Sequence, residues 1–211
     1  MIKVLTIDRE YGSGAAEIAQ QIAERLGWKL WDQLLTDEVA RQLECESFHV
    51  EKHEERKDPL YYRIFKAFLR GSYEGTLIAP QMKMADAENI RRVSEQVVRK
   101  AAAQGNAVIV GRGSAYYLRD QPDAFHIFIY APFEERVRRL KEAGKTQEEA
   151  VELACTVDRD RAEFIKQNFG IQFPARHFFH LMVNSTMGEA AAVQTVLDAL
   201  SAVQKASVER F

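Results

Sequence analysis

The chain has 211 residues, of which 46% are hydrophobic and 28% charged, a composition that excludes global disorder. With 29 Lys and Arg against 31 Asp and Glu the formal charge is −2, which excludes a general nucleic-acid-coating protein. Two cysteines are too few for a disulfide scaffold, and no apolar run reaches the length of a signal peptide or a membrane span. We therefore expect a cytoplasmic protein with neither a membrane nor a nucleic acid as partner.

The N-terminal part of the sequence predicts a strand, a glycine loop, a helix and a second strand. Residues 2–7 are an apolar run rich in β-branched side chains, typical of a buried strand. After residues 9–14 a helical apolar stripe extends to Leu26, and Gly27 is placed to cap that helix. Residues 29–31 form the second predicted strand. This order opens an α/β fold with a parallel sheet.

The rest of the chain continues the alternation of strands and helices. Further strands are predicted at residues 107–110, 125–130 and 181–183. Between them, helices are predicted at residues 85–104, from Pro132 to Glu142 and from Thr146 toward Lys166. Residues 146–149 and 186–189 each fit a capping box, so the second of these is expected to start the last helix.

Three loops are expected to meet at one edge of this sheet. Residues 9–14, 111–114 and 131–139 all follow predicted strands, and each segment carries glycine or arginine. In parallel sheets flanked by helices, ligands bind beyond the carboxyl ends of the strands. The convergence of these loops predicts a phosphate-binding site.

The loop Gly12-Ser13-Gly14 is suited to bind a phosphate with its backbone. Glycines let several N–H groups turn toward one point, and the following helix adds a partial positive charge. The alternative is a tight turn without a ligand. The loop only partly matches the full phosphate-loop pattern, because Ala15 stands at the lysine position and Ala16 at the Ser/Thr position.

A dinucleotide-binding turn is a second interpretation of the same segment. Gly12 and Gly14 follow a strand, and Asp32, at the end of the second predicted strand, is placed to bind a ribose hydroxyl. The third glycine of that motif is replaced by Glu17, whose charge opposes a pyrophosphate. Both motifs therefore match in part.

Taken together, six segments resemble the cytidylate kinase-like family. They occur in the family's order and span nearly the whole chain, at residues 9–14, 31–32, 108–113, 131–139, 158–161 and 183–186. The resemblance implies an α/β, three-layer P-loop NTPase-like parallel sheet in a single domain of residues 1–211, with its core at 1–32, 85–140 and 177–211. It further implies a helical insertion that binds the acceptor nucleotide at 33–84 and a helical lid at 141–176. The family's loop, usually Gly-Ser-Gly-Gly-Arg-Glu, also lacks the lysine, and here Ala16 replaces its arginine.

The activity implied is an ATP- and Mg²⁺-dependent transfer of the γ-phosphate to a nucleoside monophosphate or a similar small acceptor. Phosphoryl transfer needs positioned positive charge, which arginine supplies with a planar fork. Donor-binding candidates are Arg9, Gly12, Ser13, Gly14 and Ala15, and Arg9 is placed to replace the missing lysine charge. Catalytic candidates are Arg136, Arg139 and Arg161; acceptor-binding candidates are Asp32 and Arg112.

Alternatives to this function remain open at the level of the sequence. The same fold with Ala15 and Ala16 fits a module that binds a nucleotide without turnover, and the partial dinucleotide motif fits an NAD-dependent oxidoreductase. Asp32 is equally suited to cap a helix. We predict no resident metal site, because Cys45, His49 and His53 are spread too far along a helix to close on one ion. His126 is expected to be a hydrogen-bonded core residue, and a homodimer remains open.

Overall fold

The computed structural model describes residues 1–32, 34–35, 38–39 and 87–208. The predicted insertion, 33–84, lies almost entirely outside the described residues, as do Cys45, His49 and His53. Five parallel strands form one sheet in the order β2-β3-β1-β4-β5. Their bounds are β1 (Val4–Arg9), β2 (Lys29–Trp31), β3 (Ala107–Val110), β4 (Ala124–Tyr130) and β5 (Leu181–Asn184). The predicted parallel α/β sheet is confirmed.

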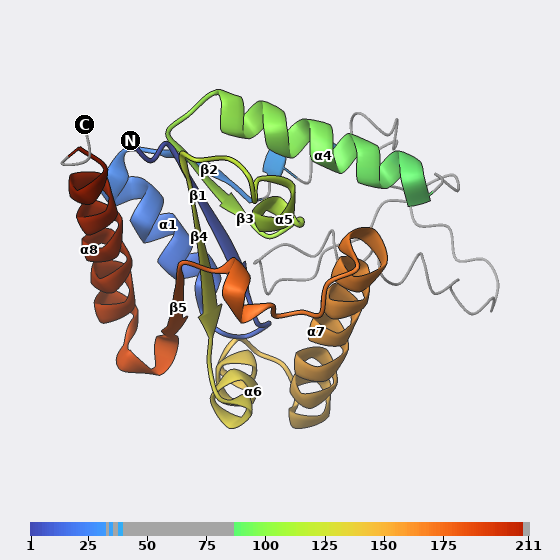
Figure 1. Cartoon of the computed structure of the whole chain (residues 1–211). Helices are drawn as coiled ribbons and strands as arrows, with labels where there is room; N and C mark the ends of the chain where they lie inside the picture. Colours follow the sequence, from blue (N-terminus) through green and yellow to red (C-terminus); the bar gives the residue numbers. More distant parts are fainter. Residues whose placement is uncertain (33, 36–37, 40–86, 209–211) are drawn as a thin grey trace.

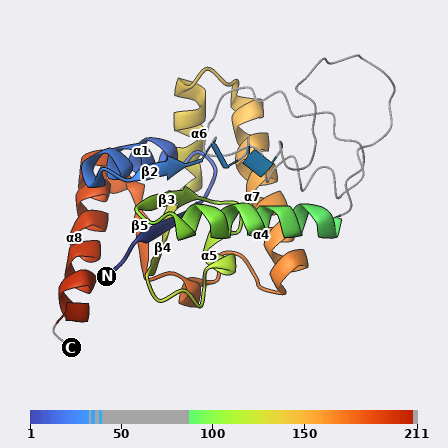
Figure 2. The same ribbon diagram turned by 90° about the horizontal axis from the view of Figure 1, so that it is seen from above.

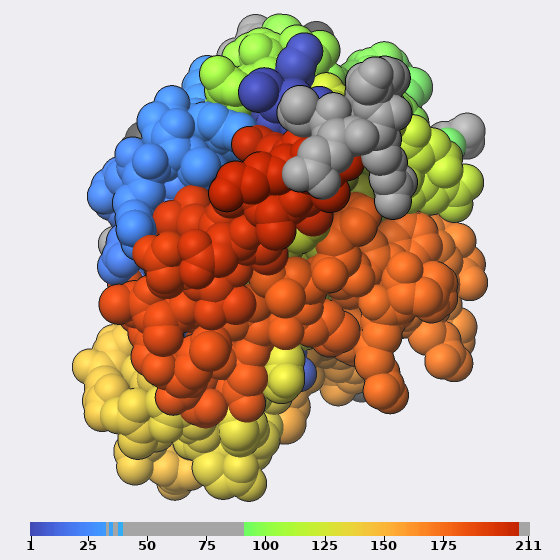
Figure 3. All heavy atoms as spheres, turned by 60° about the vertical axis from the view of Figure 1, so that its left-hand side comes forward, coloured from blue at the N-terminus to red at the C-terminus, as the bar shows by residue number. Residues whose placement is uncertain are grey.

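Helices cover both faces of this sheet, so the fold has three layers (Figure 1). The helices are α1 (Ala15–Leu26), α4 (Ala87–Ala103), α5 (Ser114–Tyr117), α6 (Phe133–Glu142), α7 (Gln147–Phe169) and α8 (Glu189–Val208). Seen from above, α1 and α8 lie together on one side of the sheet and α4 and α5 on the other (Figure 2). Figure 3 shows α8 lying against α1. No helix in the described part of the chain is long and apolar enough to span a membrane.

Strand β1 is buried along its whole length, and its apolar side chains, Val4, Leu5 and Ile7, face both layers of helices. Leu5 and Ile7 belong to the core cluster that contains Ile22 of α1 and Val196 of α8. Val4 belongs to the cluster on the opposite face, with Val97 of α4. Because β1 lies at the centre of the sheet, the loop that follows it is held between both layers.

Two of the predicted helix boundaries are confirmed and one is wrong. Gly27 ends α1 in the left-handed conformation, and Thr146 starts α7 with a complete capping box. Thr186 does not start α8, because its amide and hydroxyl both donate to Asn184 Oδ1 within a short 3-10 helix, η2 (Ser185–Met187). The side chain of Asn184 forms a turn with its own backbone, and α8 begins only after Gly188.

His126 is a hydrogen-bonded core residue, as predicted. Its Nδ1 lies 2.7 Å from Thr6 Oγ1, its backbone N–H donates to His180 Nδ1 at 2.9 Å, and its side chain packs against the His180 ring. Burial, with a smaller contribution from His180, lowers the pKa of His126 to about 4. The folded protein therefore holds a neutral imidazole at a pH where the unfolded chain is protonated.

We expect this histidine to make the protein less stable at acidic pH. Because the folded pKa is below the unfolded value of 6.5, the unfolded state binds more protons as pH falls from 6.5 toward 4. The loss approaches about 3 kcal/mol at the lower end of this window. Urea unfolding of the wild type and of His126→Asn at each pH gives the free energy of unfolding of both proteins. The contribution of His126 is the pH-dependent part of the difference between these two free energies. A difference that does not change with pH would contradict this assignment.

Candidate functional site

The carboxyl ends of the parallel strands meet beside α6 and α7, at the lower end of the sheet in Figure 1. Between β1 and α1, Gly12 and Gly14 have φ values of 78° and 73°, a backbone conformation that favours glycine. A Cβ at Gly12 would also lie 3.1 Å from the carbonyl oxygen of Arg136. Gly14 caps α1 without a side-chain hydrogen bond, so the start of this helix has no side-chain cap.

Arg139 holds one peptide group of this loop from the side of α6. Its Nη1 donates to Ser13 O at 2.7 Å and to Ser185 Oγ at 2.9 Å, while Ser185 Oγ itself donates to Ser13 O at 2.6 Å. In a trans peptide the N–H points opposite to the carbonyl. With the carbonyl of Ser13 held toward α6, the N–H of Gly14 therefore points away from it.

Arg136 does the same for the peptide group between Tyr11 and Gly12 and is itself buried. Its Nη1 donates to Tyr11 O at 3.1 Å and to Asp158 Oδ2 at 2.6 Å, and its Nε lies 3.4 Å from Glu10 Oε2. The other oxygen of Asp158 accepts the N–H of Tyr11 at 2.8 Å. Arg136 of α6 and Asp158 of α7 thus clamp Tyr11 from both sides and direct the N–H of Gly12 away from α6.

A second group of arginines lies at the ends of β1 and β3. Arg9, Arg112 and Arg161 line a cavity of about 20 Å³ together with Asp8, Phe164 and Phe173. Arg9 and Arg112 are each only 4% exposed. Arg161 donates to Arg9 O at 3.1 Å and to Asp158 Oδ1 at 3.3 Å, so Asp158 links this group to the clamp on the loop.

The side chain of Arg9 points toward β3. A Cβ built on Gly111 would lie 1.8 Å from Arg9 Nη1, so the guanidinium occupies the space that any other residue would fill. Within the described part of the chain no carboxylate lies within 4.0 Å of Arg9, although Asp32, Asp8 and Asp158 are close enough to act on its charge. Burial, followed by repulsion from Arg161, lowers the pKa of Arg9 to about 10. This buried cation is therefore placed to receive an anion.

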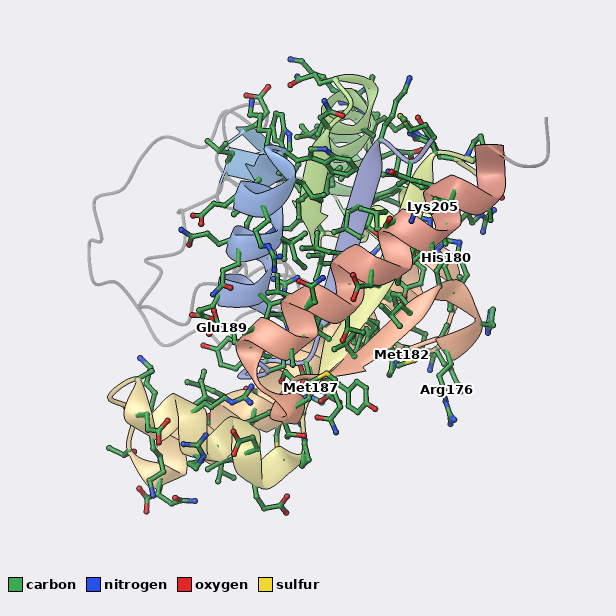
Figure 4. The ribbon with its side chains drawn as sticks, turned by 90° about the vertical axis from the view of Figure 1, so that its left-hand side faces the viewer. Arg176, His180, Met182, Met187, Glu189 and Lys205 are labelled. Carbon is green, nitrogen blue, oxygen red and sulfur yellow. The ribbon has the colours of Figure 1, made fainter. Side chains whose placement is uncertain are left out.

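A separate groove of about 520 Å³ opens beside the start of α1. Gly14 and Glu17 line one side, Arg138 and Arg139 of α6 another, and Thr186 a third. Figure 4 shows Met187 and Glu189, in the turn before α8 and at its first residue, at the end of the sheet where α6 lies. The groove is large enough for a nucleoside and is continuous with Gly14.

A sequence model of the cytidylate kinase-like family matches residues 4–187. The chain belongs to the cytidylate kinase-like family. No curated protein sequence matches it. Among solved structures, an uncharacterized protein from Eubacterium ventriosum is similar with a TM-score of 0.68 and 17% identity, over 95% of this chain and 99% of that one. Shikimate kinases from Bacteroides thetaiotaomicron and from Acinetobacter baumannii, the latter in complex with shikimate, each have a TM-score of 0.53 and 14% identity. The Bacteroides thetaiotaomicron enzyme matches over 95% of this chain and 99% of its own. The Acinetobacter baumannii enzyme matches over 96% of this chain and 94% of its own.

This member of the cytidylate kinase-like family has the P-loop NTPase fold of those kinases. Its strand order places β3, not β2, beside β1. A dinucleotide-binding sheet has its second strand next to the first, which is what brings the acidic residue after it to the ribose. Asp32 follows β2 at the edge of the sheet, so the NAD-binding interpretation is not supported by the fold.

The predicted site residues fall into two groups in this family member. Arg136 and Arg139, three residues apart on α6, both contact the glycine loop. Arg161, Arg9 and Arg112 line the cavity. Arg9 lies against Gly111, so it does not take the place over the loop that was expected for a substitute lysine.

The remaining members of the site could be predicted only in part. Asp32, a predicted acceptor-binding residue, is half-exposed near Arg9. Sequence reasoning did not assign a role to Asp8, Asp158 or Ser185. Asp158 precedes Arg161 by three residues on one helix, a spacing that places both on the same face and could have indicated the pair.

Gly111→Ala should disturb the arginine cluster, and Gly27→Ala provides a matched control. Both glycines have φ values near +64°, at 63° and 64°, so alanine strains both backbones by about 1 kcal/mol. Nothing lies within 4 Å of a Cβ at Gly27, whereas at Gly111 the guanidinium of Arg9 must move. We expect Gly111→Ala alone to weaken sulfate binding. Equal sulfate affinity in the two variants, measured by titration calorimetry, would show that Arg9 does not bind the anion.

Proposed function

We propose that the protein is an ATP-dependent phosphotransferase that moves the γ-phosphate to a nucleoside monophosphate or a similar small anionic acceptor. The observation that carries this proposal is the group of Arg9, Arg112 and Arg161 at the carboxyl ends of the strands. A buried guanidinium such as that of Arg9, with no carboxylate in direct contact among the described residues, is costly unless an anion binds there. Membership of the family supports the same conclusion.

The glycine loop and the neighbouring groove fit the donor. The N–H groups of Gly12 and Gly14 point away from α6, and the start of α1 contributes its partial positive charge to a phosphate. The groove beside Gly14 has room for the nucleoside of ATP. Mg²⁺ would be bound mainly through the ATP phosphates, as is usual for this ion. Bound Mg²⁺ would neutralise charge on the transferring phosphoryl group.

The five arginines have different roles in this reaction. Arg112 and Arg9 hold the anionic group of the acceptor, and Arg161 stabilises charge on the phosphoryl group as it moves between the two sites. Arg136 and Arg139 act through the loop, because their hydrogen bonds fix the orientation of the peptide groups that face the donor. Residues 141–176, which contain α7 and Arg161, form the proposed lid.

A thermal-shift panel of ATP, NAD and the common nucleoside monophosphates, with and without Mg²⁺, tests this function. A ligand that binds only the native state raises the melting temperature as its concentration increases. We expect shifts with ATP and with one monophosphate, and none with NAD. No shift with any nucleotide would contradict the proposal.

A nucleotide-binding module without turnover is the second candidate. It is favoured by Ala15 at the lysine position and by the direction of Arg9, which lies against Gly111. The phosphotransferase and the binding module differ in whether bound ATP is converted to ADP. Tight ATP binding without any ADP formation in the presence of every monophosphate would select the module.

A further inference from the structure

Asp8 is a buried carboxyl group in the middle of the arginine cavity. Its side chain is 6% exposed and lines the cavity with Arg9, Arg112 and Arg161. Its Oδ2 has no hydrogen-bond partner among the described residues, and none of their arginine nitrogens lies within 4.0 Å of it. A buried, unpartnered oxygen of this kind requires an explanation, because leaving it unbonded is costly.

Several charged groups surround Asp8. Arg9 follows it on β1, Arg161 faces it from α7, and both attract its negative charge. Burial raises the pKa of the Tyr116 phenol on α5, and the nearby negative charge of Asp8 raises it further. Arg112 lines the same cavity from the loop after β3. Burial outweighs the two arginines and raises the pKa of Asp8. Burial therefore favours the neutral form of this carboxyl group, and the arginines oppose it.

We propose that the arginine cavity binds a tetrahedral oxyanion together with a proton, and that Asp8 carries that proton. At about 20 Å³ the cavity holds about one water molecule, so the side chains that line it must move apart to admit the oxyanion. This inference rests on the proposed function, because it takes the oxyanion to be the phosphate group of the acceptor. An ionised Asp8 would repel an anion held by the same three arginines. A protonated Asp8 instead donates its O–H to an oxygen of the anion, and the unpartnered oxygen then has a partner. The proton comes from solvent when the anion enters and returns there when it leaves.

Linkage makes this proposal measurable through pH. If binding takes up one proton, the affinity for the anion falls by up to about tenfold per pH unit above the midpoint at which Asp8 titrates in the free protein. Asp8→Asn removes the titration and keeps a neutral side chain of the same shape that donates a hydrogen bond. Its anion affinity should therefore be independent of pH and equal to or higher than that of the wild type at neutral pH.

Sulfate is the probe, because it has the tetrahedral shape of a phosphate and does not titrate in this range. Sulfate binding is measured by calorimetry from about pH 5 to about pH 8, in two buffers that differ in ionisation enthalpy, so that proton uptake by the wild type is read directly and does not depend on a variant. Asp8→Asn is compared with Glu10→Gln. Glu10 is also a partly buried carboxyl group with a raised pKa, but it contacts Arg136 and the N–H of Ala131 and does not line the cavity.

We expect the wild type and Glu10→Gln to take up close to one proton per sulfate and Asp8→Asn to take up none. Sulfate binding by the wild type without proton uptake would overturn the role of Asp8 while leaving the arginine site, and with it the proposed function, intact. No sulfate binding by any of the three proteins at any pH would overturn the site itself. Proton uptake that persists in Asp8→Asn would assign the proton to another group and overturn the inference.

Discussion

Arg136→Met should lower the free energy of unfolding by about 3–5 kcal/mol, because it breaks a largely buried ion pair from one side. The methionine keeps much of the apolar stem but leaves Asp158 without its shortest partner, at 2.6 Å, and Tyr11 O without its donor. The clamp between α6, α7 and the glycine loop would then be lost. Urea unfolding measures the change, and donor binding should fall with it because the loop is no longer oriented.

Arg138→Met is the matched control for this prediction. Arg138 lies on the same helix, and its side chain is 55% exposed and paired with Glu135 and Glu142. Exposed ion pairs contribute little to stability, so this substitution should leave the unfolding curve nearly unchanged. If Arg136→Met proves as stable as Arg138→Met, the clamp is not what holds the loop.

Arg9→Met should have the opposite effect on stability and a large effect on binding. Arg9 is buried beside Arg161 without a carboxylate in direct contact in the described structure, so replacing it removes a desolvated charge and a repulsion. We expect the melting temperature to stay the same or to rise. Sulfate affinity should fall about 100-fold, the cost of losing a charge-assisted contact in a buried site.

Arg9→Lys separates charge from shape in the same experiment. Lysine keeps the positive charge but lacks the planar fork, so it should restore part of the affinity and not all of it. Unchanged sulfate binding in Arg9→Met, or a loss of stability as large as that of Arg136→Met, would mean that Arg9 is a structural residue. The same substitution, arginine to methionine, therefore separates two roles. Arg9→Met should lower sulfate affinity and keep stability, whereas Arg136→Met should lower the free energy of unfolding.

Most of the fold was predictable because the strands carry strong local signals. The apolar runs at β1, β3 and β4 and the glycines at positions 27 and 105 fix the elements to within one or two residues. The start of α8 was not predictable from the spacing of Thr186 and Glu189. The oxygen of Asn184, which takes the N–H of Thr186, sits only two residues away and competes for it.

The site was predictable in its residue types but not in its contacts. The spacing of Arg136 and Arg139 places them on one face, yet what that face touches is a loop more than a hundred residues earlier. The direction of Arg9 depends on Gly111, which reaches it only through the pairing of β1 with β3. Local patterns carry no information on such pairings, so Asp8 and Ser185 could not be assigned to the site, and Asp158 was indicated only by its spacing to Arg161.

Phosphoryl transfer itself is the most direct test of the account. Wild type and Arg9→Met are incubated with ATP, Mg²⁺ and each nucleoside monophosphate in turn, and the phosphorus NMR spectrum is followed. We predict that the wild type forms ADP and one nucleoside diphosphate in equal amounts. The rate of this reaction in Arg9→Met should be lower by about 100-fold or more. ATP that binds but is never consumed with any acceptor, or equal rates in the two proteins, would contradict a phosphotransferase built on the arginine cavity.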